Sequence, residues 1–191
     1  VYQGSIDWKA VKDSGISFVI IRCGFRGYGT GRLVKDTNFY SYIKGANDVG
    51  LKVGIYVFSQ AINEAEAVEE ASLCVNMAQG YRVSYPIFID VESVPAGGRA
   101  NALTKDERTR VCKAFCETIK SAGYTPGVYA NKDYLRNKLN ASELNGYKIW
   151  LAHYCTTTDY TGKYDLWQRS SKGSVNGIKG NVDLDVSYLG Y

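Results

Sequence analysis

The sequence predicts an α/β fold in which one mostly parallel, barrel-like sheet carries helices on its outside. Seven apolar runs of strand length recur along the chain, and segments with a helical spacing of apolar residues separate the first four. The runs are hydrophobic at most positions, which indicates strands covered on both faces. Parallel strands also need crossover connections, which helices supply. The predicted strands span residues 17–24, 51–59, 85–92, 125–131, 148–154, 164–170 and 181–188.

Three helices are predicted between the first four strands, over residues 38–50, 63–78 and 104–123. Each ends near a glycine, the residue that commonly stops a helix. Side chains that can accept from the free N–H groups of a first turn lie near each start. The predicted N-caps are Asp36, Asn63 and Thr104.

The chain beyond Trp150 has a different pattern. Residues 156–163 and 171–180 are short and rich in turn formers, so they predict hairpin-like connections without helices. An earlier glycine-rich segment, residues 24–32, matches neither phosphate-loop pattern, and we expect a flexible loop at the rim of the barrel. The predicted barrel is therefore covered by helices in its first part and bare in its last.

Length and composition favour a single domain spanning residues 1–191. No apolar run approaches the roughly 18 residues that cross a bilayer, so membrane insertion is not expected. The net charge of +4 is dispersed and accompanies no nucleic-acid motif, which argues against a nucleic-acid partner. Five cysteines without a CxxC pair, and a single histidine, predict free buried thiols rather than a disulfide framework or a metal site.

A pair of acids ends the third predicted strand. In "YPIFIDVES", residues 85–93, Asp90 and Glu92 are two apart, so in a strand both point to one face about 6.6 Å apart. The carboxyl ends of strands are where α/β barrels carry their active sites. Two like charges in a partly apolar site cannot both ionise at low cost, so one carboxyl should keep a proton near neutral pH. A proton donor beside a negative group suits glycosidic cleavage.

The sequence leaves other interpretations of these acids open. Asp90 and Glu92 can equally cap nearby helices or pair with surface arginines. Asp183, near the end of the chain, favours an active site because the last strand of a closing barrel returns beside the first. Asp183 can also be a turn acid, and Asp185 competes with it for any role.

Aromatic residues are abundant, with sixteen tyrosines and three tryptophans. Flat rings suit stacking on sugars, although most rings fill cores. Tyr56 and Phe58 alternate onto one face of their strand, as do Trp150 and Tyr154, so these rings can line the barrel mouth or pack inside it. Arg22 ends an apolar run, where a buried guanidinium requires a carboxylate partner; a structural ion pair and a substrate contact are equally expected.

Several ordered motifs resemble one known family over essentially the whole chain. They are "QGSIDWKAVKDSG", "IRCGFRGYGTG", "VGIYVFSQA", "FIDVES", "AGYTPGVYAN", "IWLAHY" and "LWQRSSKGSVNGIKGNVDLDVSY". In these the chain resembles the glycoside hydrolase family 25 lysozymes, the Chalaropsis-type muramidases. The resemblance implies a modified TIM-like barrel of five βα units followed by three strands with few helices. It also implies hydrolysis of the β-1,4 bond between N-acetylmuramic acid and N-acetylglucosamine in peptidoglycan.

The resemblance also implies roles for single residues. Glu92 would act first as the acid and then as the base, and Asp90 would steady the substrate's own N-acetyl group as it attacks the anomeric carbon. Asp183 matches the family's late acid. The residues that match groove-lining positions of the family are Tyr56, Phe58, Tyr129 and Trp150.

The resemblance implies an enzyme that needs neither metal nor cofactor. Its partner would be bacterial cell-wall peptidoglycan, on which we expect it to act as a monomer. The location implied is extracellular, through secretion or through release of a phage-encoded protein at the cell wall.

Three departures from the family pattern bear on this expectation. A strand of the pattern Gly-x-Asp-x-Ser usually precedes the motif that here contains Gln3, and its absence would expose the edges of two neighbouring strands. His153 stands where Gln is common, and Arg169 follows "WQ" where Tyr is usual. Two alternatives to a muramidase therefore remain: a non-catalytic glycan-binding barrel and a chitinase-like hydrolase.

Overall fold

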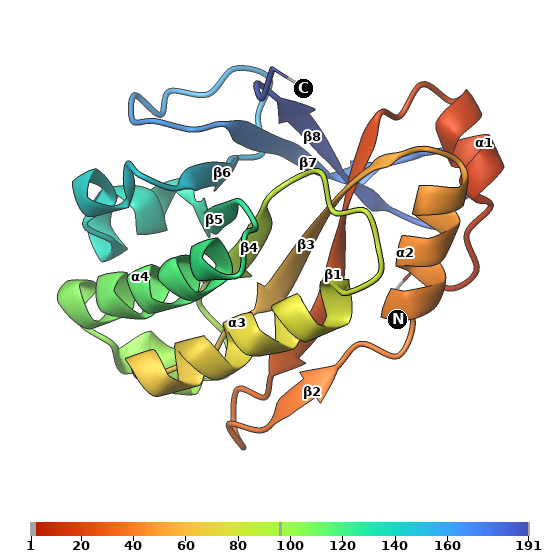
Figure 1. The fold of residues 1–191 in the computed structure, drawn as a ribbon. Coiled ribbons are helices and arrows are strands. Elements are labelled where there is room, and N and C mark those ends of the chain that lie inside the picture. The colour runs from red at the N-terminus through yellow and green to blue at the C-terminus, as the bar shows by residue number, and fades with distance from the viewer. Residues whose placement is uncertain (1–2, 96, 191) are drawn as a thin grey trace.

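The computed structural model describes residues 3–95 and 97–190, in which eight strands form one curled sheet (Figure 1). The strand order is β2-β1-β3-β4-β5-β6-β7-β8. All pairings are parallel except β1 with β2 and β7 with β8, at the two ends of the order. The α/β prediction and all seven predicted strands are confirmed. The strands are β1 (Phe18–Arg26), β2 (Leu33–Lys35), β3 (Lys52–Phe58), β4 (Ile87–Asp90), β5 (Pro126–Asn131), β6 (Lys148–Ala152), β7 (Leu166–Gly173) and β8 (Val182–Ser187).

Helices cover only the first part of the sheet, as predicted. Figure 1 shows α2, α3 and α4 along one side of it, and within residues 153–190 no helix is present. None of the described helices is long and apolar enough to cross a membrane. The helices are α1 (Trp8–Asp13), α2 (Phe39–Asp48), α3 (Glu64–Ala78) and α4 (Lys105–Ser121), with short turns at Arg99–Ala102, Tyr134–Lys138 and Ala141–Leu144.

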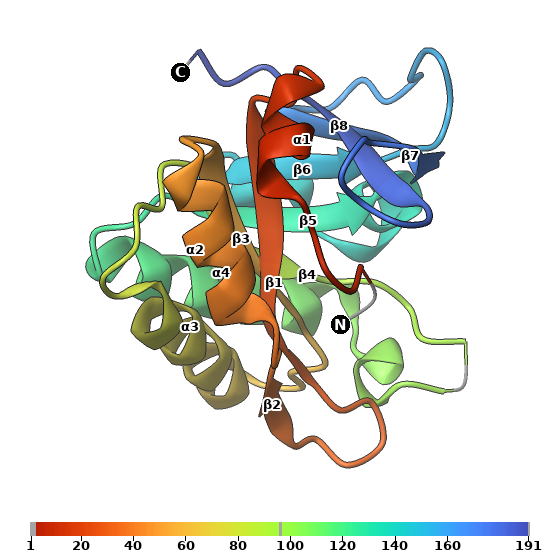
Figure 2. The same cartoon turned by 90° about the vertical axis from the view of Figure 1, so that its right-hand side faces the viewer.

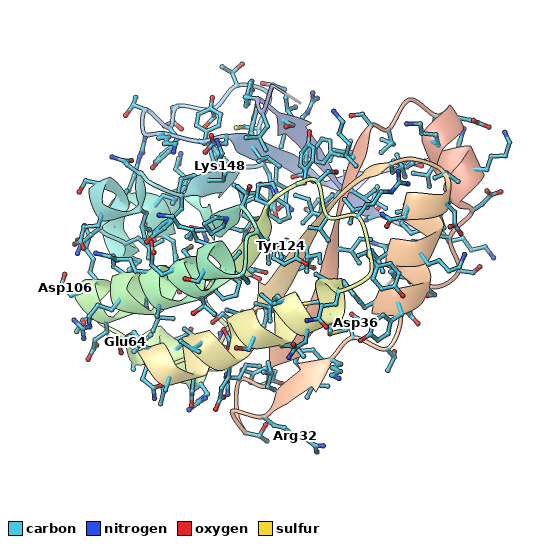
Figure 3. All side chains as sticks on the ribbon, viewed as in Figure 1. Arg32, Asp36, Glu64, Asp106, Tyr124 and Lys148 are labelled. Carbon is cyan, nitrogen blue, oxygen red and sulfur yellow. The ribbon has the colours of Figure 1, made fainter. Side chains whose placement is uncertain are left out.

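Two of the three predicted N-caps are confirmed. The Asn63 side chain accepts from the Glu66 N–H at 2.9 Å, and Thr104 forms a reciprocal capping box with Glu107. The third prediction is wrong, because α2 begins after Asn38. Asp36, labelled in Figure 3, instead accepts from the Asn38 N–H and from the guanidinium of Arg22.

The glycine-rich segment 24–32, which the sequence predicts to be a loop, belongs to a hairpin. Strand β1 continues to Arg26, and the turn is closed by the Gly27 N–H, which donates to the Arg32 carbonyl at 2.9 Å. Strand β2 then pairs back onto β1, with Gly24 opposite Lys35. A Cβ at Gly24 would lie 2.5 Å from the Val34 carbonyl oxygen, so this close pairing requires glycine.

The two faces of the sheet bury different side chains, which explains why the strand sequences are hydrophobic throughout. On β4, Ile87 and Ile89 belong to the large core beneath the helices. The intervening Phe88 joins a second, smaller cluster on the inner face of the sheet. Because side chains two apart share a face, Asp90 lies on the Phe88 side. The alternation therefore sends a carboxyl group to the inside of the curled sheet.

The sheet does not close on itself in the described chain, because no pairing joins β1 to β8. A cavity occupies the interval instead, and it is lined by consecutive residues of both strands, 18–22 and 182–185. Figure 2 looks onto this side, where α1 meets the connection from β7 to β8. There the Asp7 N–H donates to the Gly177 carbonyl at 2.9 Å. Residues 18–22 of β1 and strand β8 each have one edge without a strand partner in the described chain.

Candidate active site

The cavity between β1 and β8 has a volume of about 630 Å³, enough for a ligand of several rings. It reaches the inner face of the sheet, where Tyr56, Tyr129 and Trp150 contribute to its wall. Five carboxyl groups also line it: Asp36, Asp90, Glu92, Asp183 and Asp185. The sequence elements that carry them lie far apart along the chain, so the curl of the sheet creates this acidic site.

Asp90 and Glu92 both line the cavity, as the sequence predicts. Asp90 is the last residue of β4 and is 6% exposed, whereas Glu92 lies beyond the strand end and is half-buried. The prediction of a strand extending to Glu92 is therefore too long. The Oδ1 atom of Asp90 is buried and has no hydrogen-bond partner within the described part of the chain.

The environment favours the protonated form of both carboxyl groups. Burial raises the pKa of Asp90 well above its ordinary value, and the negative charges of Glu92 and Asp183 add to this rise; Arg22 opposes it. Burial also raises the pKa of Glu92, again with a contribution from Asp183. Both carboxyl groups therefore hold their protons to a higher pH than free side chains do, and burial contributes more to this than the like-charge repulsion that the sequence predicts.

Asp183 and Asp185 come from the last strand. Asp183 is exposed at the cavity, yet partial burial raises its pKa. Asp185 accepts a hydrogen bond of 2.7 Å from the Trp150 indole Nε1. Burial is the main cause that raises the pKa of Asp185 to about 7, and the hydrogen bond from Trp150 partly opposes it. Both acids that the sequence left in competition thus line the cavity, and each has its own environment.

Arg22 forms the structural ion pair that the sequence offers as one alternative, whereas the substrate contact stays a prediction. Its Nε and Nη2 donate to Asp36 Oδ2 at 3.0 and 2.8 Å, and it also lines the cavity. Burial alone would raise the pKa of Asp36, but hydrogen bonds from the Asn38 N–H and Arg22 outweigh it, so the pKa is lowered. Asp36 therefore stays ionised. The ion pair holds a guanidinium beside the cavity, where its charge acts on Asp90.

The predicted rings both fill the inner cluster and line the cavity. Trp150 lies 4.5 Å from Tyr129 and 6.1 Å from Tyr56 between ring centroids, with edge-on geometry in each pair. Phe58 differs from the other three predicted groove residues. It is half-buried beside Asp90 in the sheet register but is not among the described residues that line the cavity.

Sequence reasoning missed Gln168. Its Oε1 accepts from the hydroxyl groups of both Tyr129 and Tyr154, at 2.8 and 2.9 Å. Gln168 is 3% exposed and lines the cavity, so it anchors a buried ring and an exposed ring together. The available signal was a polar residue within the apolar run 164–170. By contrast, Arg169 is exposed, and the His153 ring hydrogen-bonds Thr158 at 2.8 Å.

All five cysteines are free thiols, four of them buried and Cys155 half-buried, as the spacing predicts. Within residues 3–95 and 97–190, no group of three or more His, Cys, Asp or Glu side chains is arranged to hold a metal ion. The groups in the cavity that are suited to catalysis are its carboxyl groups. One can donate a proton to a leaving oxygen while another, charged or hydrogen-bonding, stabilises positive charge on a sugar.

Comparisons with known proteins agree on one family. The model of glycosyl hydrolases family 25 matches residues 1–178. The chain is 30% identical over 184 residues to the autolytic lysozyme of Clostridium acetobutylicum, covering 96% of this chain and 52% of that protein. It is 29% identical over 191 residues to the uncharacterized protein YegX of Escherichia coli K12, covering 97% of this chain and 66% of YegX.

The fold comparison points the same way. The modular autolysin LytC of Streptococcus pneumoniae, solved in complex with a synthetic peptidoglycan ligand, is similar with a TM-score of 0.84 and 27% identity. The match covers 98% of this chain and 44% of LytC. The chain thus spans about half the length of the autolytic lysozyme and less than half of LytC.

Proposed function

Because the chain belongs to glycosyl hydrolases family 25, we propose that it is a muramidase that cleaves peptidoglycan at the β-1,4 bond between N-acetylmuramic acid and N-acetylglucosamine. The observation that carries the proposal is the pair Asp90 and Glu92, held in a cavity that raises the pKa of both. The glycan-bound LytC complex supports a peptidoglycan substrate. A wall substrate also favours action outside the cell that makes the protein.

Glu92 is the proton donor in this proposal. It lines the cavity and is less buried than Asp90, so it can reach the oxygen of a bound glycosidic bond. As the bond from the anomeric carbon to that oxygen breaks, the Glu92 proton passes to the leaving sugar. The resulting carboxylate then takes a proton from the water that attacks the anomeric carbon, so the acid is restored.

Asp90 acts on the substrate group that attacks the anomeric carbon. The substrate's own N-acetyl oxygen is the proposed nucleophile, and it forms a bond to the anomeric carbon while the leaving oxygen departs. The attack of water in the second step breaks this bond and regenerates the N-acetyl group. The positive charge that develops on the amide favours the ionised form of Asp90, which accepts a hydrogen bond from the amide N–H and stabilises that charge. Its Oδ1, buried without a partner in the described chain, is an acceptor available for this purpose.

Product analysis tests the proposal. Purified protein is incubated with insoluble peptidoglycan, the new reducing ends are reduced with borohydride, and the sugars are identified by mass spectrometry. A muramidase produces reduced N-acetylmuramic acid, whereas a chitinase-like hydrolase leaves reduced N-acetylglucosamine. Binding to peptidoglycan without new reducing ends would replace the proposal with a glycan-binding barrel.

The decisive variant is Glu92→Gln, which keeps the shape of the side chain and removes its proton. Glu64→Gln is the matched control, because Glu64 is exposed on α3 in a surface ion pair with Arg110. Only the first substitution should abolish new reducing ends. Equal loss in both variants, or in neither, would count against Glu92 as the acid.

A further inference from the structure

A hydrogen bond across the inner face of the sheet joins strands that are not neighbours. Trp150 on β6 donates from Nε1 to Asp185 Oδ1 on β8 at 2.7 Å, and β7 lies between these two strands in the sheet. Only the curl of the sheet brings the two side chains together. This bond therefore ties the position of a ring to the final strand, which borders the open side of the cavity.

Trp150 is the central ring of the cavity wall. Its centroid lies 4.5 Å from Tyr129, 5.2 Å from Phe88 and 6.1 Å from Tyr56, and the residue is 4% exposed. The indole has a single polar atom, Nε1, and a buried donor of this kind needs an acceptor. Asp185 is the acceptor that the structure records for it.

A charged carboxylate is an unfavourable acceptor beside the buried Trp150 ring, because burial destabilises its charge. A neutral amide or hydroxyl oxygen would satisfy the indole, whereas burial of a carboxylate disfavours its charged form. The charged acceptor makes a shorter and stronger bond than a neutral one. The position of Trp150 is therefore coupled to the charge on Asp185.

We propose that Asp185 is a positioning residue, which fixes the Trp150 ring in the wall of the cavity and thereby sets the affinity for the glycan. This inference rests on the proposed function for its substrate. It gives Asp185 a role separate from that of Asp183, which makes no such bond to the ring among the described residues. Asp185 acts through Trp150 rather than on the reacting atoms.

Protonation of Asp185 should loosen the ring. The other ionisable groups that line the cavity are Arg22, Asp36, Asp90, Glu92 and Asp183, together with the tyrosines of α2, β3, β5 and the segment after β6. Among them, the charge of Asp183 adds to the effect of burial on Asp185. Titration of Asp185 should consequently change the environment of the Trp150 indole near neutral pH.

Kinetics with soluble peptidoglycan fragments form the first test. Asp185→Ala should raise KM at least about fivefold with kcat changed less, because a buried donor loses its partner and the wall contact is lost in ground and transition states alike. Asp185→Asn, which keeps a neutral acceptor oxygen, should recover only part of that loss. In a Trp150→Phe background, Asp185→Ala should have little further effect on KM. An equal rise in both backgrounds would overturn the proposal.

Fluorescence forms the second test and needs no turnover. Trp150 emission, obtained as the difference from Trp150→Phe, should shift with pH near neutrality in the unmodified protein and stay constant in Asp185→Asn. Trp167→Phe is the matched control, because its Nε1 donates to the His153 carbonyl and it does not line the cavity. A pH response that persists in Asp185→Asn would overturn the coupling, whereas an inactive protein with the expected response would count only against the proposed function.

Discussion

Removing the charge of Asp185 should change the stability of the protein in a way that favours the variant increasingly as the pH rises. Burial raises the pKa of this group from 3.8 to about 7. A raised carboxyl pKa contributes stability that is fully present below the unfolded value and is lost as the pH rises through the folded value. Asp185→Asn has no such loss. Its stability relative to the original protein should therefore increase as the pH rises towards 7.

The size of this change in stability follows from the pH range over which the folded and unfolded proteins differ in protonation of Asp185. Between pH 5 and pH 8, about two pH units lie below the folded pKa, and each unit corresponds to about 1.4 kcal/mol, so the relative gain has an upper limit of about 3 kcal/mol. The Trp150 hydrogen bond is already included in that pKa. The weaker bond that Asn accepts from the indole lowers the stability of the variant at both pH values.

Urea unfolding at pH 5 and pH 8 measures the difference. Asp48→Asn is the control, because Asp48 lies in an exposed ion pair with Lys44. We expect the free energy of unfolding of Asp185→Asn, relative to the original protein, to rise between pH 5 and pH 8. That of the control should not. A stability difference between the two proteins that stays constant from pH 5 to pH 8, or that shifts in favour of the original protein, would refute the argument that burial disfavours this carboxylate.

Three further predictions concern the acid, a helix cap and the hairpin. Glu92→Gln should keep the fold and lower turnover on peptidoglycan at least about a hundredfold, as expected for a lost general acid; near-normal turnover would remove Glu92 from that role. Thr104→Ala breaks the capping box of α4 and should cost about 1 kcal/mol in urea unfolding, whereas an unchanged midpoint would contradict the cap. Gly24→Ala places a Cβ 2.5 Å from the Val34 carbonyl and should destabilise the protein by about 1 to 3 kcal/mol; a neutral outcome would contradict the close pairing.

The sequence predicts those features that local chemistry determines. Continuous apolar runs identify seven strands, and the caps Asn63 and Thr104 follow from the local bonds that their side chains make. The two-residue period also places Asp90 on the inner face. These properties depend on residues close together along the chain, so they can be predicted from the amino-acid sequence alone.

The remaining features depend on the curl of the sheet and on pairing between distant segments. Strand β2 has only three residues and is stabilised by β1, so its own sequence carries little signal. The sequence predicts Asp36 as a helix cap, because its ion-pair partner Arg22 is fourteen residues away and local spacing does not reveal the pair. The bond from Trp150 to Asp185 spans an intervening strand, and no spacing rule along the sequence encodes such a distance.

The central claim is that burial and the charge of Asp183 keep a proton on Glu92. The pH dependence of kcat/KM on soluble peptidoglycan fragments, compared between the original protein and Asp183→Asn, tests it most directly because this ratio reports ionisation in the free enzyme. We predict that kcat/KM falls at high pH with an apparent pKa above the ordinary value of glutamate. In Asp183→Asn this fall, the basic limb of the profile, should move to lower pH. A limb that stays in place or moves to higher pH would contradict the claim.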